Sequence, residues 1–347
     1  MTDLEQILPL WRELEASGAE YVLATVVKVE GSSYRKPGAR MLLAADGRRA
    51  GTVSGGCLEA AVAKKAWWLT ESGPVVKDYS TLEDDGEFPY GSGCGGVVWI
   101  LLERRGSADE VLKALEQAWN ARVPLAIATV LEGERIGQRA FARAAGDLEL
   151  TTLEKFHADL PVWIEEHAAR LGLWVFGAGD DAKPLVKMAR MLGWYVAIAD
   201  GRSHLATAGR FVEADAVSVL TADELPPFDV RTGDAAVVMT HSFEQDVLIL
   251  AGLMSRAAWP AYIGVLGPQR RTQELLGNVA RKLDLAPSEK LFRGWLADLH
   301  APTGLDLGAE TPAAIALSIM AEIQKTLMGG TALPLRQVRG MRAAVRG

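Results

Sequence analysis

The residues of this chain that are best suited to chemistry are its two cysteines, each of which lies in a glycine-rich segment. Cys57 follows Ser54, Gly55 and Gly56, and Cys94 also lies among glycines. Consecutive glycines expose backbone N–H groups that can bind an anion, and the helix predicted to begin at Cys57 would favour the thiolate. An accessible thiolate suits a soft metal or a sulfur-bearing ligand. The alternative is a small, buried apolar side chain, which is what most single cysteines are.

The spacing of the cysteines argues against a structural zinc site. Cys57 and Cys94 are 37 positions apart, and no histidine lies beside either of them. A structural zinc ion needs four ligands, which normally come in closely spaced pairs. The two thiols are therefore not interpreted as a zinc site.

A cationic loop precedes the first of these segments. Residues Gly31–Arg40 contain Arg35, Lys36 and Arg40 together with hydroxyl side chains and glycines. Such a loop can surround an oxyanion, because arginine makes paired hydrogen bonds to phosphate. The alternative is a hairpin loop whose charges are solvated, and the residues alone do not separate the two.

A dinucleotide-type motif lies in the second half of the chain. Gly177–Ala182 matches G-x-G-x-x-A between a predicted strand and a predicted helix, and Asp200 follows 21 positions after Gly179. In a Rossmann fold the glycines allow a tight turn and close approach of a ligand, and the acidic residue accepts hydrogen bonds from a ribose. Arg202 lies two residues further on and would soften the repulsion of a 2′-phosphate.

Other residues around this motif argue against ordinary dinucleotide binding. Asp180 and Asp181 occupy the predicted first helical turn, where they compete with pyrophosphate for the same N–H groups. The fold can therefore be a Rossmann fold without its usual ligand. His241 follows another predicted strand, at the edge where ligand crevices open. A ligand contact and a loop histidine bonded to its own surroundings both stay open for it.

The elements that must position these residues differ between the two halves. Over residues 1–150, apolar periodicity and turn residues predict a mixed α/β domain, and 151–168 are predicted to be a linker. Helices are predicted at 3–15, 57–69 and 108–119, and strands at 21–29, 40–44, 50–53, 97–102 and 125–131.

The second half alternates strands with helices, which is typical of a parallel, doubly wound sheet. A Rossmann-like domain is predicted over 169–330, followed by a tail over 331–347. Thr311 and Pro312 are the N-cap and first residue of the last helix. The other elements are strands at 171–176, 194–200, 216–220, 235–240 and 261–266, and helices up to 192, at 244–256 and at 272–284.

Composition excludes several classes of protein. The chain has 37 basic and 44 acidic side chains, a net charge of −7, which argues against nucleic-acid binding through a basic surface. Two cysteines in 347 residues exclude a disulfide scaffold and favour a reducing compartment. No apolar run approaches the roughly 20 residues that span a bilayer, and no signal peptide is apparent. We therefore expect a cytoplasmic protein that does not enter the membrane.

Taken in order along the chain, these motifs resemble the XdhC/CoxI family, the xanthine dehydrogenase accessory proteins. The resemblance covers most of the chain, although Asp180 stands where many members have histidine after Gly-x-Gly. The similar segments in the first half are Gly31–Met41, Ser54–Glu59 and Gly93–Gly96. Those in the second half are Phe176–Gly179, Asp200–Arg202, Met239–Ser242, Ile263–Gly267 and Gly304–Ala309.

The resemblance implies an accessory role rather than turnover of a metabolite. Members of the family bind the molybdenum cofactor, protect it while its terminal sulfido ligand is installed, and help to deliver it to a molybdenum hydroxylase of the xanthine dehydrogenase type. The resemblance also implies a homodimer, with a cysteine desulfurase as a further candidate partner. The protein is therefore expected to be a non-catalytic, cofactor-binding protein.

The resemblance also suggests which residues contact molybdopterin. Cys57 and Cys94 are the candidate metal ligands, and Glu59 is expected to orient the loop. The other candidate contacts in the first half are Arg35, Ser54, Gly55 and Gly56. The candidates in the second half, where NAD(P) is the alternative ligand, are Gly177, Gly179, Asp200, Arg202 and His241.

Two other classes of function remain open. One is an NAD(P)-dependent oxidoreductase that uses the C-terminal domain, although no acid–base set other than His241 is apparent for it. The other is a scaffolding partner of the dehydrogenase in which both sites are empty. Binding of NAD(H) and dependence on the loop residues would distinguish these hypotheses.

Overall fold

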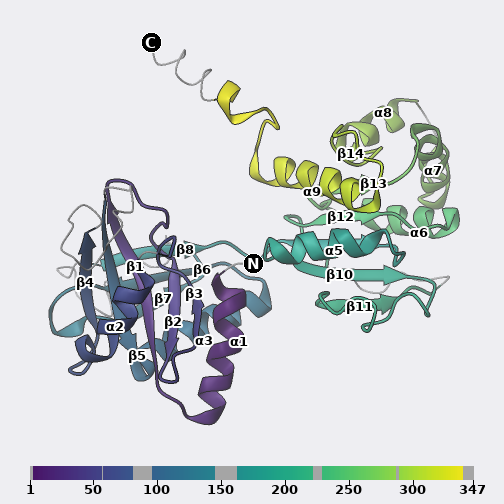
Figure 1. Ribbon diagram of the computed structural model, residues 1–347. Coiled ribbons are helices and arrows are strands. Elements are labelled where there is room, and N and C mark those ends of the chain that lie inside the picture. Colours follow the sequence, from purple (N-terminus) through teal and green to yellow (C-terminus); the bar gives the residue numbers. More distant parts are fainter. Residues whose placement is uncertain are drawn as a thin grey trace. The chain divides into compact units, whose positions relative to one another are not determined.

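The computed structural model describes residues 3–56, 58–80, 96–144, 162–221, 229–286 and 289–338. The chain divides into two compact units, Met1–Arg170 and Leu171–Gly347, whose elements are labelled in Figure 1. Both cysteines lie outside the described residues, so the predictions for their thiols remain predictions.

The N-terminal unit is built on a five-stranded antiparallel sheet with the strand order β3-β2-β1-β5-β4. The central strand β1 is rich in β-branched residues and is buried over most of its length, as predicted. Glu30, at the end of β1, pairs with Val97, at the start of β5. The strands are β1 (Tyr21–Glu30), β2 (Arg40–Ala44), β3 (Arg49–Gly51), β4 (Val75–Ser80) and β5 (Val97–Arg104).

Helices cover both faces of this sheet, because successive side chains of a strand point to opposite faces. Helices α1 (Asp3–Ser17) and α3 (Arg105–Ala121) share one apolar core with Tyr21 and Leu23 of β1. Helix α2 (Glu59–Leu69) packs on the other face, in a core with Val22.

A smaller antiparallel sheet with the order β7-β6-β8 completes the unit. Its strands are β6 (Leu125–Val130), β7 (Arg139–Ala142) and β8 (Val162–His167), with a short 3-10 helix, η1 (Gly133–Arg135), before β7. Strand β8 lies within the segment 151–168, for which the sequence predicts a linker. Pairing with β6 makes Val162–His167 part of the unit.

The C-terminal unit contains a six-stranded parallel sheet with the order β11-β10-β9-β12-β13-β14. This is the order of a dinucleotide-binding Rossmann fold. The strands are β9 (Gly172–Phe176), β10 (Tyr195–Asp200), β11 (Ala216–Val219), β12 (Ala235–Val238), β13 (Tyr262–Val265) and β14 (Leu299–His300).

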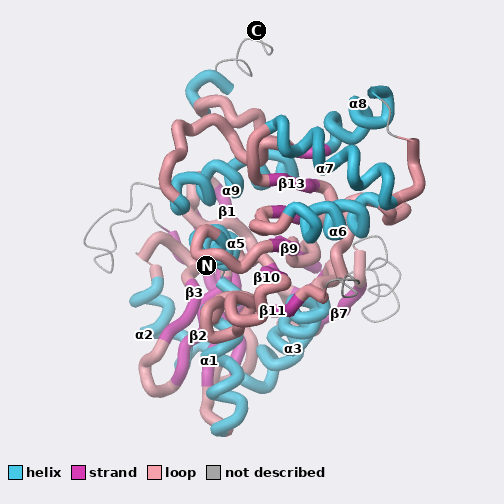
Figure 2. The backbone as a smooth tube through the Cα atoms, turned by 90° about the vertical axis from the view of Figure 1, so that its right-hand side faces the viewer, coloured by secondary structure: helices cyan, strands magenta, loops and turns pink. Residues whose placement is uncertain are grey.

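Helices lie on both faces of the parallel sheet. Helices α5 (Ala182–Met191) and α9 (Pro312–Met328) share one core, whereas α6 (Phe243–Met254) and α7 (Gln269–Lys282) share the other and lie side by side (Figures 1 and 2). A further helix, α8 (Glu289–Asp298), precedes β14. The predicted fold class, a mixed α/β domain followed by a Rossmann-like doubly wound domain, is confirmed.

Membrane insertion receives no support from the helices. Across the described ranges, none combines the length and the apolar character needed to span a bilayer.

Candidate functional site

A buried hydrogen-bond network fixes the loop before α2. Glu59, the first residue of α2, is 6% exposed, and its carboxylate accepts hydrogen bonds from the backbone N–H groups of Val53 (3.2 Å) and Ser54 (2.8 Å). The Ser54 hydroxyl donates to the same carboxylate (2.5 Å) and accepts from the N–H groups of Gly56 (3.1 Å) and Leu58 (3.0 Å). Two side chains, those of Ser54 and Glu59, thus hold the backbone on both sides of position 57.

The electrostatics of Glu59 suit this holding role. Burial raises the pKa of the carboxyl group, but hydrogen bonds from the Ser54 hydroxyl and from backbone N–H groups together lower its pKa below the usual value. The group is therefore an ionised acceptor at neutral pH. It is not arranged to act as a proton donor.

Helix α2 begins at Glu59, two residues later than the sequence predicts. The difference has a local cause, because the N–H groups of Gly56 and Leu58 bond to the Ser54 side chain. Leu58 is thus the N-cap of α2, and the predicted first residue, Cys57, lies outside the described residues. Gly55 and Gly56 are exposed, and Gly56 has a φ of +113°, a conformation that favours glycine.

The loop between β1 and β2 lies against both glycine-rich segments. A Cβ atom on Gly55 would lie 3.4 Å from Cγ of Tyr34, so the tyrosine ring lies over this glycine. A Cβ atom on Gly96 would overlap the carbonyl oxygen of Ser32 and lie 2.7 Å from that of Glu30, so only glycine fits there. The flanks of both cysteine-bearing segments therefore meet one loop, a juxtaposition that the sequence does not reveal.

The cations of that loop are largely committed within the protein. Arg35 pairs with Asp3, and Arg40 is buried and pairs with Glu165 of β8. Burial raises the pKa of Glu165, but the Arg40 charge and a hydrogen bond from His167 outweigh it and hold that pKa at about 2. The expected oxyanion-binding use of these side chains therefore requires Arg35 to exchange its partner, and Arg40 has a structural role.

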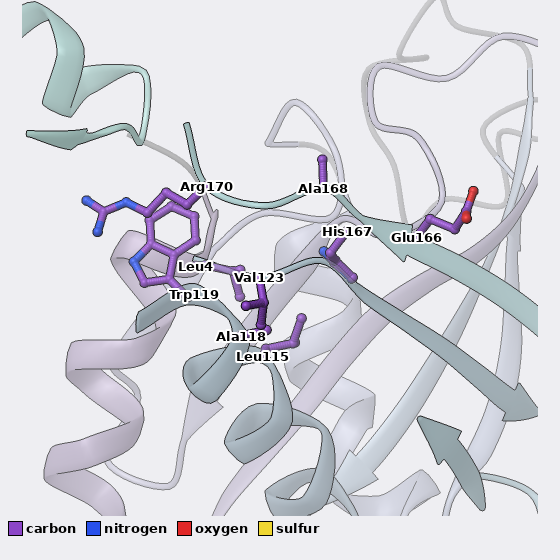
Figure 3. A pocket seen from close by; sticks show the side chains of 9 residues that line it. All are labelled: Leu4, Leu115, Ala118, Trp119, Val123, Glu166, His167, Ala168 and Arg170. Carbon is purple, nitrogen blue, oxygen red and sulfur yellow. The ribbon is translucent and has the colours of Figure 1, made fainter. Parts of the chain in front are cut away.

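A pocket that the sequence does not predict is lined by residues of α1, α3 and β8 (Figure 3). Its volume is about 230 Å³. The Arg170 guanidinium lies 4.6 Å from the centre of the Trp119 ring, and His167 contacts Glu165 at 3.1 Å. The remaining lining residues are Leu4, Leu115, Ala118, Val123, Glu166 and Ala168. No candidate cofactor contact is among the lining residues.

In the C-terminal unit, Gly177 brings the turn after β9 close to the end of β12. Gly177 has a φ of +133°, and a Cβ atom there would lie 2.6 Å from the carbonyl oxygen of Met239. Its N–H donates to Ala199 of β10 (2.8 Å). The glycine is therefore required by internal packing, whether or not a ligand binds.

The Asp200 carboxylate is engaged within the protein. The residue is 0% exposed, and its carboxylate accepts hydrogen bonds from the N–H groups of Ala178 (2.7 Å) and Arg202 (2.8 Å) and from the Arg202 guanidinium (2.7 and 3.0 Å). Burial raises the pKa of Asp200, but these hydrogen bonds lower its pKa below the usual value. A ribose would have to displace Ala178 or Arg202, so this geometry opposes the role that the sequence suggests for Asp200 and Arg202.

The two remaining candidates of the C-terminal unit lie together. Nε2 of the exposed His241 would be 3.7 Å from a Cβ atom on Gly179. Both residues follow strands at the carboxyl edge of the sheet. Asp180 is 80% exposed and pairs with Lys183 (2.7 Å) and Arg210 (2.9 Å), which lower its pKa.

A polar network around α9 is not foreseen from the sequence. Glu322 accepts hydrogen bonds from the Tyr262 hydroxyl (2.6 Å) and the Gly304 N–H (2.7 Å), and it contacts Nδ1 of His300 at 3.2 Å. Tyr262 also contacts the Thr303 hydroxyl at 2.5 Å. The sequence singles out Gly304–Ala309 only as a segment similar to the family. It does not show that Tyr262 and Gly304 both bond to Glu322, because these residues are far apart along the chain. The network holds the loop after β14 to α9.

Clusters of three or more histidine, cysteine or acidic side chains that could hold a metal ion do not occur within the described ranges.

The fold and the site define the class of the protein. It is a two-unit α/β protein. An antiparallel unit presents exposed glycines beside one loop, and a Rossmann-type unit, whose acidic residue is engaged internally, follows it in the sequence.

Comparison with known protein families identifies this class. The model described as the XdhC Rossmann domain matches residues 173–323, and that of the XdhC and CoxI family matches residues 14–80. With the relatives described next, these matches show that the chain belongs to the XdhC and CoxI family.

Several relatives match over most of their length. The chain is 32% identical to a Bacillus subtilis protein named as a probable xanthine dehydrogenase subunit, over 88% of this chain and 93% of that protein. It is 26% identical to the molybdenum cofactor insertion chaperone PaoD of Escherichia coli, over 92% and 88%. A crystal structure of a xanthine dehydrogenase from Bacillus halodurans matches with a TM-score of 0.74 and 30% identity, over 96% of this chain and 97% of that one.

Proposed function

We propose that this protein binds the molybdenum cofactor in its N-terminal unit and supports insertion of the cofactor into a molybdenum hydroxylase of the xanthine dehydrogenase type. The names of two relatives, a cofactor insertion chaperone and a probable xanthine dehydrogenase subunit, support the general role. The observation that carries the proposal is structural. The exposed Gly55 and Gly56 lie in a turn that Ser54 and Glu59 hold. Gly55 contacts the loop between β1 and β2, and Gly96, two residues after Cys94, contacts the same loop.

The residues present fit the chemical groups of the cofactor. Molybdopterin carries a phosphate, and the backbone of the exposed Gly55 is suited to bind an anion. Its molybdenum is a soft metal centre that a thiolate can bind, and we assign this contact to Cys57 and Cys94. Glu59 supports the site indirectly, because it fixes the backbone next to position 57.

The bound cofactor would supply the metal centre that the hydroxylase uses. This chain would hold that group, shield it from water, and keep it accessible for sulfuration. We include in the proposal that sulfur is delivered by a cysteine desulfurase partner and that the protein acts as a homodimer. The Rossmann-type unit is then a structural or partner-binding element, because Asp200 and Arg202 bind each other.

The proposal is tested by expressing the protein in cells that make molybdopterin and in cells that do not. We expect molybdenum and molybdopterin to co-purify with the wild-type protein only from the first cells. Cys57→Ala should lower both contents and reduce maturation of the partner hydroxylase, whereas Lys183→Ala, a change at an exposed ion pair of the other unit, should not. Absence of molybdopterin from the wild-type protein, together with normal maturation by Cys57→Ala, would contradict the proposal.

A further inference from the structure

Tyr34 is an exposed aromatic side chain at the centre of the proposed site. It is 75% exposed, although aromatic side chains usually bury most of their large apolar surface. The residue lies in the loop that contacts both glycine-rich segments, between Ser32, which contacts Gly96, and the exposed Lys36. Its position therefore calls for an explanation beyond packing.

The contact with Gly55 shows how the ring is supported. Cγ and Cδ1 of Tyr34 lie 3.4 and 3.5 Å from the place that a Cβ atom of Gly55 would take. One edge of the ring thus rests on glycine backbone, and most of the side chain remains open to solvent. A flat ligand could stack on the open part of the ring while its polar groups reach the backbone of the exposed Gly55.

We infer that Tyr34 is a specificity-determining residue that stacks on the planar aminopyrimidinone ring of the cofactor's pterin. This inference rests on the proposed function and deepens it. Stacking on an aromatic side chain is tolerant of substituents and selects a planar heteroaromatic ring. The glycine amides and thiols would then bind the other end of the same ligand, its phosphate and metal dithiolene group.

The chain offers matched variants for a test. Tyr34→Phe keeps the aromatic ring, and Tyr34→Leu keeps apolar bulk but removes the ring. Trp68, on α2, is 69% exposed, so Trp68→Leu removes a similarly exposed aromatic residue outside the loop between β1 and β2. Because Tyr34 is exposed, thermal unfolding of its variants should match that of the wild-type protein.

The test measures binding of molybdenum cofactor, released from a molybdoenzyme, to the purified full-length chain. Protein-bound cofactor is separated by ultrafiltration and its pterin is oxidised and quantified by fluorescence. We expect Tyr34→Leu to weaken binding by roughly 10-fold or more, while Tyr34→Phe and Trp68→Leu bind like the wild-type protein. A simple pterin without phosphate or dithiolene should compete for the wild-type site and should compete less well for Tyr34→Leu.

Two results separate this inference from the proposed function. If the wild-type protein binds the cofactor and Tyr34→Leu binds it equally well, the inference about Tyr34 is wrong and the proposed function stands. If the wild-type protein binds no cofactor, the proposed function fails and the inference fails with it.

Discussion

The glycine turns before α2 and after β9 are both held by a carboxylate, but their glycines differ in exposure. In each, a buried carboxylate accepts backbone N–H groups of the turn, Glu59 in the N-terminal unit and Asp200 in the C-terminal unit. Gly55 and Gly56 are nevertheless exposed, whereas Gly177 is packed against the end of β12. A glycine motif beside an acidic residue therefore does not by itself indicate a ligand site. What differs between the two turns is whether their glycines are exposed or packed against the protein.

The largest expected effect is on the free energy of unfolding, when one glycine in each turn is replaced by alanine. Gly177→Ala places a Cβ atom 2.6 Å from the Met239 carbonyl oxygen at a φ of +133°, and we expect it to lower the free energy of unfolding by about 4 kcal/mol. Gly56→Ala meets no atom of the described residues within 4 Å at a φ of +113° and should cost about 1–2 kcal/mol from backbone strain. Calorimetric unfolding measures both, and equal losses would contradict the comparison.

Removing the charge of each carboxylate should separate stability from cofactor binding. Glu59→Gln and Asp200→Asn each replace an acceptor oxygen by an amide that faces N–H donors, so each should cost about 2 kcal/mol. Only Glu59→Gln should lower the molybdopterin content of the purified protein, because only that turn belongs to the proposed site. A loss of cofactor in Asp200→Asn without unfolding would move the site to the C-terminal unit.

Acid unfolding gives a smaller, shared effect. The pKa values of Glu59 and Asp200 are lower in the folded protein than their usual values, so their ionised forms stabilise the fold above the usual carboxyl range. That contribution is lost as the pH falls through the folded-state pKa values. Stability measured between pH 6 and pH 3 should therefore decrease less steeply in Glu59→Gln and in Asp200→Asn than in the wild-type protein. Parallel curves would argue against ionised carboxylates in the turns.

The smallest expected effect is on dinucleotide binding. Since Asp200 is occupied by Ala178 and Arg202, titration calorimetry with NAD(H) should show no saturable binding at Kd values below about 1 mM. Gly179→Val should change nothing in this measurement. Saturable heat that Gly179→Val abolishes would instead favour an NAD-dependent oxidoreductase.

Local sequence signals were enough for most of the elements. The β-branched run at 21–29 predicts β1, and Thr311 with Pro312 predicts the start of α9, where the threonine hydroxyl accepts from Ala314 N–H (3.2 Å). Strand β8 was missed because its sequence, VWIEEH, combines charged with apolar residues. Strand β14 has two residues, too few for a periodic pattern.

The site could be predicted only in part, for a physical reason. Residue types and local order singled out the Ser54–Glu59 segment, in which the structure places a hydrogen-bond network. The contact of Gly96 with Ser32 depends on the pairing of β1 with β5, which sequence periodicity does not encode. The contact of Gly55 with Tyr34 joins two loops that carry no local signal for it. The same holds for the internal engagement of Asp200, because the motif shows an acidic residue but not which groups occupy it.

The most direct test of cofactor binding at the N-terminal glycine turn is hydrogen–deuterium exchange of the full-length protein with and without added molybdenum cofactor. We expect slower amide exchange on cofactor addition in the peptides that cover residues 31–38 and 53–58, with no change in residues 177–182. Protection confined to residues 177–182, or protection nowhere while the cofactor is bound, would contradict binding at this turn.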